Sequence, residues 1–150
     1  MVEAMDEGVG RIVETIRKLG LERKTLIVFC SDNGATRRGS NAPLNGYKGS
    51  LWEGGHRVPA IAYWPGRIEA GAVCHETVLG MDFFPTMASI TGTELPADLK
   101  LDGVDLAPVL LRGGSLPDRT LFWAFRNQRA VRRGPWKLLI QGDKVRLFNL

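Results

Sequence analysis

The residues with the clearest chemical potential follow an apolar run that ends at Cys30. Ser31-Asp32-Asn33-Gly34 places a carboxylate and an amide oxygen side by side. Both are hard oxygen donors of the kind that Ca²⁺ and Mg²⁺ bind, and Gly34 lets the backbone turn sharply away. The sequence therefore predicts Asp32 and Asn33 as metal ligands. A plain turn capped by these two side chains is the alternative.

A second group of candidates lies in the glycine-rich stretch 46–59. Lys48 is flanked by small residues that allow a ligand to approach, and an ammonium there can act as a point charge on an oxyanion. Lysines in glycine loops are mostly solvated, which is the alternative for Lys48. Arg57 either binds the same anion or pairs with Glu53. His56 is either a rim residue that touches substrate or a plain loop histidine.

The flanking sequence predicts a scaffold for these two segments. Apolar residues three and four apart from Val2 to Leu19 indicate an amphipathic helix that ends before Gly20. The apolar run 25–30 is typical of a strand covered on both faces, with Cys30 as a small core residue. Helix, connection and buried strand form half of a doubly wound α/β unit. Such sheets bind ligands beyond the carboxyl ends of their strands, where the loop 31–57 begins.

The rest of the chain divides into further elements. We expect a strand at 58–64, a helix that Asp82 caps and that ends at Gly92, and a short helix that starts at Asp105 and runs through Leu111. Short strands are expected at 121–125, 129–133, 136–141 and 144–149, with a hairpin turn at 142–143. The predicted organisation is an α/β region at 1–112, a linker at 113–118 and a small antiparallel subdomain at 119–150.

The composition is that of a globular protein. The 150 residues are 44% hydrophobic and 24% charged, with a net charge of +4. Two cysteines do not make a disulfide framework, and the absence of a Cys-x-x-Cys spacing argues against a structural zinc site. No apolar run approaches the roughly 20 residues that span a bilayer. The N-terminus has no signal-peptide pattern.

Taken in order, these segments resemble the C-terminal part of the sulfatase family, within the alkaline-phosphatase-like superfamily. The matching runs are Ser31-Asp32-Asn33-Gly34, Lys48-Gly49-Ser50-Leu51-Trp52-Glu53-Gly54-Gly55, Met81-Asp82-Phe83-Phe84-Pro85-Thr86, Leu101-Asp102-Gly103-Val104-Asp105 and Gly134-Pro135-Trp136-Lys137-Leu138. The fold implied is α/β, with a partial doubly wound sheet of the alkaline-phosphatase-like type followed by a small C-terminal antiparallel sheet.

The resemblance also implies roles. Asp32 and Asn33 would ligate an active-site Ca²⁺ or Mg²⁺, and Lys48 would contact the substrate sulfate and the leaving oxygen. The family hydrolyses sulfate esters with a formylglycine made in a Cys/Ser-x-Pro/Ala-x-Arg segment, and neither Cys30 nor Cys74 begins such a segment. We therefore expect a parent protein that acts on a sulfated small molecule or sulfated glycan. This chain alone should bind the cation weakly and be inactive.

Two other functions remain open. A non-catalytic module would bind polyanions through the basic residues Arg129, Arg132 and Arg133, with a homo-oligomer covering the exposed sheet edges. The other alternative is hydrolysis of phosphate or phosphonate esters within the same superfamily, because a metal and a lysine suit either anion.

Overall fold

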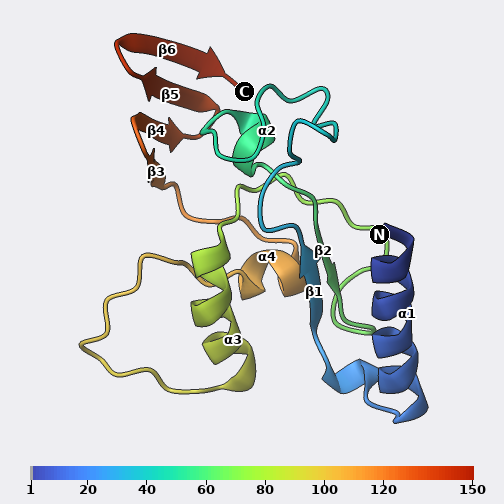
Figure 1. The fold of residues 1–150 in the computed structure, drawn as a ribbon. Coiled ribbons are helices and arrows are strands. Elements are labelled where there is room, and N and C mark those ends of the chain that lie inside the picture. Colours follow the sequence, from blue (N-terminus) through green and yellow to red (C-terminus); the bar gives the residue numbers. More distant parts are fainter. Residues whose placement is uncertain (1) are drawn as a thin grey trace. The chain divides into compact units, whose positions relative to one another are not determined.

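The structure is a computed structural model that describes residues 2–150. Figure 1 shows helices, a short two-stranded sheet and a four-stranded sheet, which confirms the α/β class. Residue contacts define two compact units. The first contains the chain up to Val28 and Ala62–Leu116, and the second contains Phe29–Ile61 and Pro117–Leu150. The loop after the first strand thus groups with the C-terminal strands.

The first helix, α1 (Val2–Lys18), forms as its apolar spacing predicts. Its chain reverses at Gly20, whose φ of 66° is a left-handed conformation that glycine adopts without strain. Val9, Val13 and Ile16 are half-buried, whereas Val2 and Ile12 are 75% and 60% exposed. Within the described residues no side chain of α1 is fully buried, and no helix is both long and apolar enough to cross a bilayer.

The strands β1 (Ile27–Cys30) and β2 (Ala60–Tyr63) pair in the two-stranded sheet. The expectation of a strand buried on both faces is wrong for this chain. Ile27 and Val28 are half-buried, and Phe29 and Cys30 are exposed. A sheet that has two strands within residues 2–150 gives β1 one neighbour, so the side chains lack the cover that a wider sheet provides. Cys30 is consequently an exposed free thiol and not a core residue.

A buried polar hub organises the helical part of the first unit. It joins the turn η2 (Gly80–Asp82), α3 (Phe83–Thr91) and α4 (Ala107–Arg112). The Asp82 carboxylate accepts hydrogen bonds from the backbone N–H groups of Leu79 (2.7 Å) and Val104 (3.0 Å). Thr86 donates to the Asp82 carbonyl and accepts from the N–H of Leu106. The predicted helix is confirmed, but Asp82 does not cap it, because its carboxylate serves the preceding turn.

The second unit is built on an antiparallel sheet in the order β3-β4-β5-β6. The strands are β3 (Thr120–Phe125), β4 (Gln128–Arg133), β5 (Trp136–Gln141) and β6 (Lys144–Asn149), within a residue or two of the predicted bounds. Leu51, Ala130 and Leu139 form the core of this unit. In β5, Lys137 and Leu139 are two residues apart and share one face, and both are buried. The short helix α2 (Glu53–His56) belongs to the same unit.

Candidate functional site

Hydrogen bonds from the backbone and from one side-chain amide connect separate segments of the loop 31–57. Gly34 N–H donates to the Gly55 carbonyl and Lys48 N–H donates to the Ala35 carbonyl, both at 3.0 Å. The half-buried Asn41 amide accepts from Ala35 N–H at 2.7 Å and donates to the carbonyls of Ala35 and Gly46. These bonds bring the backbone that follows Asp32-Asn33 alongside the backbone at Lys48.

Glycines allow this close approach. A Cβ at Gly34 would collide with the carbonyl oxygen of Gly54, and a Cβ at Gly54 would collide with the carbonyls of Gly46 and Asn45. Any larger residue at Gly34 or Gly54 would therefore push the neighbouring backbone segments of the loop apart. The glycine pattern in the sequence reflects packing of backbone on backbone at these positions.

The side chains of the three principal candidates, Asp32, Asn33 and Lys48, are not engaged by other described residues of the chain. Asp32 and Lys48 are exposed and Asn33 is half-buried. Within residues 2–150, the side chains of these three residues have no hydrogen bond or ion pair. Their functional groups are thus free for ligands from outside. That the Lys48 ammonium converges on the other two side chains stays a prediction.

The oxygen atoms that Asp32 and Asn33 offer are of the type that a hard cation binds, but they are too few to fill its coordination shell. Asp32 and Asn33 offer oxygen atoms, whereas Ca²⁺ takes about six to eight oxygen ligands. No group of three or more His, Cys, Asp or Glu side chains suited to a metal occurs within the part of the chain that the structure describes. Asp32 and Asn33 can therefore supply part of a coordination shell, and further ligands would be needed to complete it.

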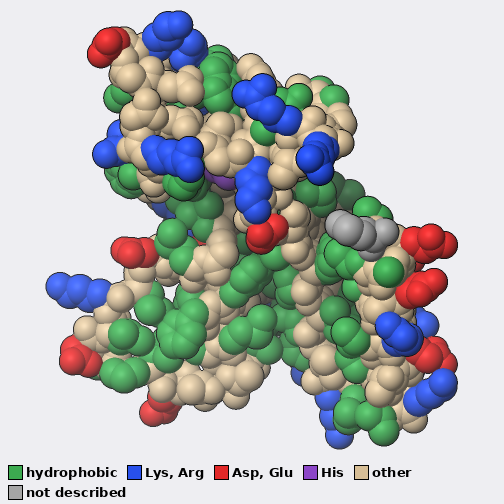
Figure 2. Space-filling view, in the orientation of Figure 1, with side chains coloured by type: hydrophobic (Ala, Val, Ile, Leu, Met, Phe, Trp, Pro, Cys, Tyr) green, Lys and Arg blue, Asp and Glu red, His purple; other side chains and the backbone are tan. Residues whose placement is uncertain are grey.

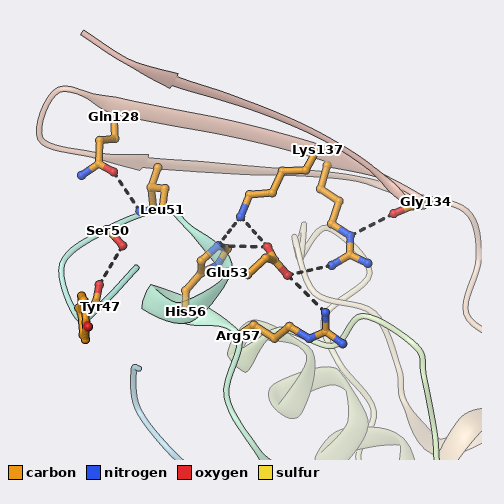
Figure 3. A network of polar contacts seen from close by, with 10 residues as sticks. Tyr47, Ser50, Leu51, Glu53, His56, Arg57, Gln128, Gly134 and Lys137 are labelled. Atoms are coloured by element: carbon orange, nitrogen blue, oxygen red, sulfur yellow. Dashed lines mark hydrogen bonds and ion pairs between the residues drawn. The ribbon is translucent and has the colours of Figure 1, made fainter. Parts of the chain in front are cut away.

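A buried charge network joins α2, at the end of the loop 31–57, to the C-terminal sheet (Figure 3). The Lys137 ammonium donates to Glu53 Oε1 at 2.6 Å and lies 2.7 Å from His56 Nε2. The Lys137 side chain is 2% exposed and the Glu53 side chain is 11% exposed. Arg132 and Arg57 each approach Glu53 Oε2 to 3.7 Å. One carboxylate therefore serves three cationic side chains, and Lys137 fixes α2 to the sheet.

The pKa values of Glu53, His56 and Lys137 are all lowered in this network. Burial alone would raise the pKa of Glu53, but the hydrogen bond and charge of Lys137 outweigh burial and lower it. Burial lowers the pKa of His56, and the positive charge of Lys137 lowers it further. Burial also lowers the pKa of Lys137, against the opposing effect of Glu53. At neutral pH His56 is therefore neutral and can accept the Lys137 hydrogen bond at Nε2.

His56 and Arg57, the weaker candidates for substrate contact, have defined partners in this chain. Arg57 pairs with Glu53, which the sequence offered as its alternative. The His56 and Trp123 rings form a T-shaped contact, with 5.0 Å between the ring centroids. Their role toward a substrate stays a prediction. Sequence reasoning missed Lys137 as part of this cluster. The available signal was a lysine on the same strand face as Leu139, with Glu53 as a possible buried partner.

The basic C-terminal sheet is largely occupied by contacts within the chain. Arg133 pairs with Asp118 at 2.9 Å, and Arg132 reaches Glu53 and the Gly134 carbonyl. Arg129 donates to the carbonyls of Arg126 and Gln128. Figure 2 shows Lys and Arg side chains gathered over the second unit, with few acidic ones among them. The cations proposed from sequence for a polyanion module are therefore partly neutralised by partners in this chain.

Comparisons with known proteins agree with one another. The family model described as Sulfatase matches residues 1–93. N-acetylgalactosamine-6-sulfatase of Mus musculus is 41% identical over 91% of this chain, and steryl-sulfatase of Mus musculus is 47% identical over 75%. Arylsulfatase A of Homo sapiens is 40% identical over 89%. The chain spans 27%, 19% and 28% of the lengths of these three proteins.

Solved structures give the same picture. The crystal structure of Ps i-CgsB in complex with k-i-k-neocarrahexaose superposes with a TM-score of 0.92 and 35% identity, covering 99% of this chain and 35% of the other. The crystal structure of PsFucS1 sulfatase from Pseudoalteromonas sp. gives a TM-score of 0.77 and 29% identity, covering 97% of this chain and 32% of the other.

Proposed function

Because this chain belongs to the sulfatase family, we propose that the protein of which it forms part hydrolyses sulfate esters, with Asp32, Asn33 and Lys48 in its active site. The observation that carries the proposal is the family match over residues 1–93, which includes all three residues. The chain spans about a quarter of the length of the curated relatives it matches. The remaining active-site groups, a formylglycine nucleophile among them, would come from outside these 150 residues.

Asp32 and Asn33 would hold a divalent cation, Ca²⁺ or Mg²⁺. Both side chains are hard oxygen donors, and neither is engaged elsewhere in residues 2–150. A bound cation would polarise the sulfate oxygens and offset their negative charge. The carboxylate of Asp32 would contribute charge to the shell, and the amide oxygen of Asn33 would contribute a neutral ligand.

Lys48 would act on the sulfate itself. Its backbone N–H is anchored to the Ala35 carbonyl, so the base of the side chain is fixed near the Asp32-Asn33 turn. An ammonium with no carboxylate partner keeps its full charge for a ligand. We infer that it contacts a sulfate oxygen and stabilises the negative charge that grows on the leaving oxygen in the transition state.

The substrate class that fits this site is a sulfated small molecule or sulfated glycan. The relatives named above act, by their names, on N-acetylgalactosamine-6-sulfate, steryl sulfate and aryl sulfates. The first of these is a sulfated sugar, and Ps i-CgsB was crystallised with k-i-k-neocarrahexaose. A sulfated glycan is therefore the first class to test.

The decisive experiment measures hydrolysis of 4-nitrophenyl sulfate by the whole protein that carries this chain. Lys48→Ala should lower kcat/KM by about 100-fold or more, because removal of one charge-stabilising donor has effects of that size. Lys100→Ala removes an exposed lysine of the first unit and should leave the rate unchanged. Equal rates for the Lys48→Ala and unmodified proteins would refute the assignment. Faster hydrolysis of 4-nitrophenyl phosphate than of the sulfate would favour the phosphate ester alternative.

A further inference from the structure

The second unit contains a cavity of about 960 Å³ that extends from Lys48 to the hairpin ends of the sheet. Its lining includes Arg37, Arg38, Lys48, Trp52, Gln128 and Gln141. A volume near the upper end of the range for ligand pockets is far larger than one sulfate group needs. The cavity is thus large enough for sugar units next to the ester that Lys48 would contact.

The charged residues that line the cavity all carry a positive charge. Three cationic residues line it, and its lining contains no Asp or Glu. Within the described residues, Arg37, Arg38 and Lys48 form no ion pair, in contrast to Arg57, Arg132 and Lys137, which share Glu53. Arg37 stacks over the ring of Tyr47, with the guanidinium carbon 5.9 Å from the centroid. Cations without carboxylate partners in a concave site are available to an anionic ligand.

The two arginines stand on a fixed turn. Gly39 N–H donates to the Thr36 carbonyl at 2.9 Å, and Arg38 N–H lies 3.4 Å from the Thr36 hydroxyl. Asn41 ties the preceding residue, Ala35, to Gly46. The same Ala35 carbonyl accepts from Lys48 N–H. One hydrogen-bonded framework therefore carries Lys48 and both guanidinium groups.

The part of the lining that comes from the C-terminal sheet is also fixed. Gln128 accepts from Leu51 N–H at 3.1 Å and donates to the Gly49 carbonyl at 3.4 Å, so its amide is committed to the loop. Gln141 pairs with Gln128 across β4 and β5, at the same end of the sheet. The Gln141 amide can hydrogen-bond to sugar hydroxyl groups, because it has no hydrogen bond to another side chain within residues 2–150.

We propose that this cavity binds a second anionic group of the substrate through Arg37 and Arg38, so that the protein prefers glycans that carry an anionic group on the sugar next to the one being desulfated. This inference rests on the proposed function and narrows its substrate class. The planar guanidinium fork suits a sulfate or a carboxylate on that neighbouring sugar. Arg37 and Arg38 are thus specificity-determining residues, whereas Lys48 belongs to the reaction itself.

The experiment compares two substrates in the whole protein. One is a disaccharide with a single hydrolysable sulfate, and the other is the same disaccharide with a second sulfate on the adjacent sugar. The ratio of their kcat/KM values measures recognition of the second anion. Arg37→Gln and Arg38→Gln should each lower this ratio about tenfold, which is the lower end for a charge-assisted hydrogen bond at an open site. Hydrolysis of the singly sulfated disaccharide should fall less, because it lacks the second anion.

The matched control is Arg133→Gln. Arg133 also lies in the second unit, at the opposite end of β4 from Gln128, and does not line the cavity. The substitution removes the same charge, so a general electrostatic effect would lower the ratio equally in all three variants. A ratio that is unchanged in Arg37→Gln and Arg38→Gln, or that falls as far in Arg133→Gln, would overturn the inference. Arg37→Lys and Arg38→Lys should restore part of the ratio, since the charge is kept.

Equilibrium binding separates the inference from the proposed function. Isothermal titration calorimetry of the doubly sulfated disaccharide in EDTA requires no turnover. Binding that weakens in Arg37→Gln and Arg38→Gln, in a protein that hydrolyses no sulfate ester, would uphold the anion site and refute the proposed function. Normal hydrolysis of the sulfate ester, with binding that neither substitution weakens, would support the proposed function and refute the anion site.

Discussion

Lys137 shows how strongly one buried residue can determine the structure around it. Its ammonium joins β5 to α2 across 84 residues of sequence. Removing one member of a buried ion pair leaves the other charge without a partner, which costs more than the pair itself contributes. Glu53 retains Arg57 and Arg132 at 3.7 Å, but its Oε2 atom has no hydrogen bond and is inaccessible to water. Lys137 is thus the one close donor to this carboxylate within residues 2–150.

We predict that Lys137→Met lowers the free energy of unfolding by about 3 to 5 kcal/mol. Urea denaturation measures this change. Arg133→Met breaks the exposed pair with Asp118, whose side chains are 71% and 65% exposed, and should cost no more than about 1 kcal/mol. The double variant Lys137→Met/Glu53→Leu removes both charges and should recover part of the loss. Equal stability of Lys137→Met and the unmodified protein would show that the network contributes nothing to folding.

The same cluster predicts a dependence of stability on pH. His56 and Glu53 have folded pKa values below their ordinary values of 6.5 and 4.5. The folded chain therefore binds fewer protons than the unfolded chain in these windows, and stability rises with pH. The contribution of His56 is present above about pH 6.5 and is lost as the pH falls below it, with Glu53 following below about pH 4.5.

Thermal unfolding at a series of pH values tests this. In the unmodified protein, Tm should fall between pH 7 and pH 5. The slope should be reduced in His56→Phe, which cannot be protonated. His75 is exposed and makes no hydrogen bond or ion pair within residues 2–150, so His75→Phe should keep the slope of the unmodified protein. A slope that is the same in all three proteins would contradict the assignment to His56.

Sequence reasoning at the scale of single residues selects candidates by residue type and spacing. Asp32, Asn33 and Lys48 were proposed in this way, and their role in a ligand site stays a prediction. Lys137 was missed because its role depends on a partner that only the folded chain brings near. From the sequence alone, a lysine between Trp136 and Leu138 is expected to be a solvated strand residue. Its buried role follows only from the contact with Glu53 in the folded chain.

At the scale of elements, the glycine-rich loop is determined by packing of backbone on backbone. We predict that Gly54→Ala disrupts the loop, because its Cβ would meet the carbonyl oxygens of Gly46 and Asn45. The variant should lose activity in the whole protein by more than tenfold and lower Tm. Gly8→Ala is the control, since nothing lies within 4 Å of a Cβ there and it is inside α1. That change should raise stability by up to about 1 kcal/mol.

Helices and hairpins were predicted well because their signals are local. The apolar spacing of α1, the left-handed Gly92 after α3 and the turns of the C-terminal sheet all act within a few residues. The burial of β1 was predicted wrongly because it depends on neighbouring strands. An apolar run indicates that a strand can be covered on both faces, whereas Phe29 and Cys30 are exposed in this chain. The role of Asp82 was likewise set by Leu79 and Val104, outside its own helix.

At the scale of the whole molecule, this chain would supply only part of the proposed active site. In that proposal, Asp32 and Asn33 are two ligand side chains and Lys48 is one cation. The curated relatives are about four times as long as the matched segment. Exposed apolar side chains such as Val2 (75%) and Ile61 (63%) lie on α1 and β2, and apolar surface of this kind marks places where further protein can bind.

We therefore predict that the 150-residue chain, expressed alone, binds Ca²⁺ weakly and hydrolyses no aryl sulfate. Two of the about six to eight ligands that calcium takes cannot offset the loss of its hydration shell with high affinity. Isothermal titration calorimetry should give a dissociation constant in the millimolar range, with Asp32→Ala abolishing the binding. Release of 4-nitrophenol from its sulfate ester by this chain, prevented by EDTA, would contradict the prediction. It would mean that a nucleophile lies among residues that the sequence pattern does not identify.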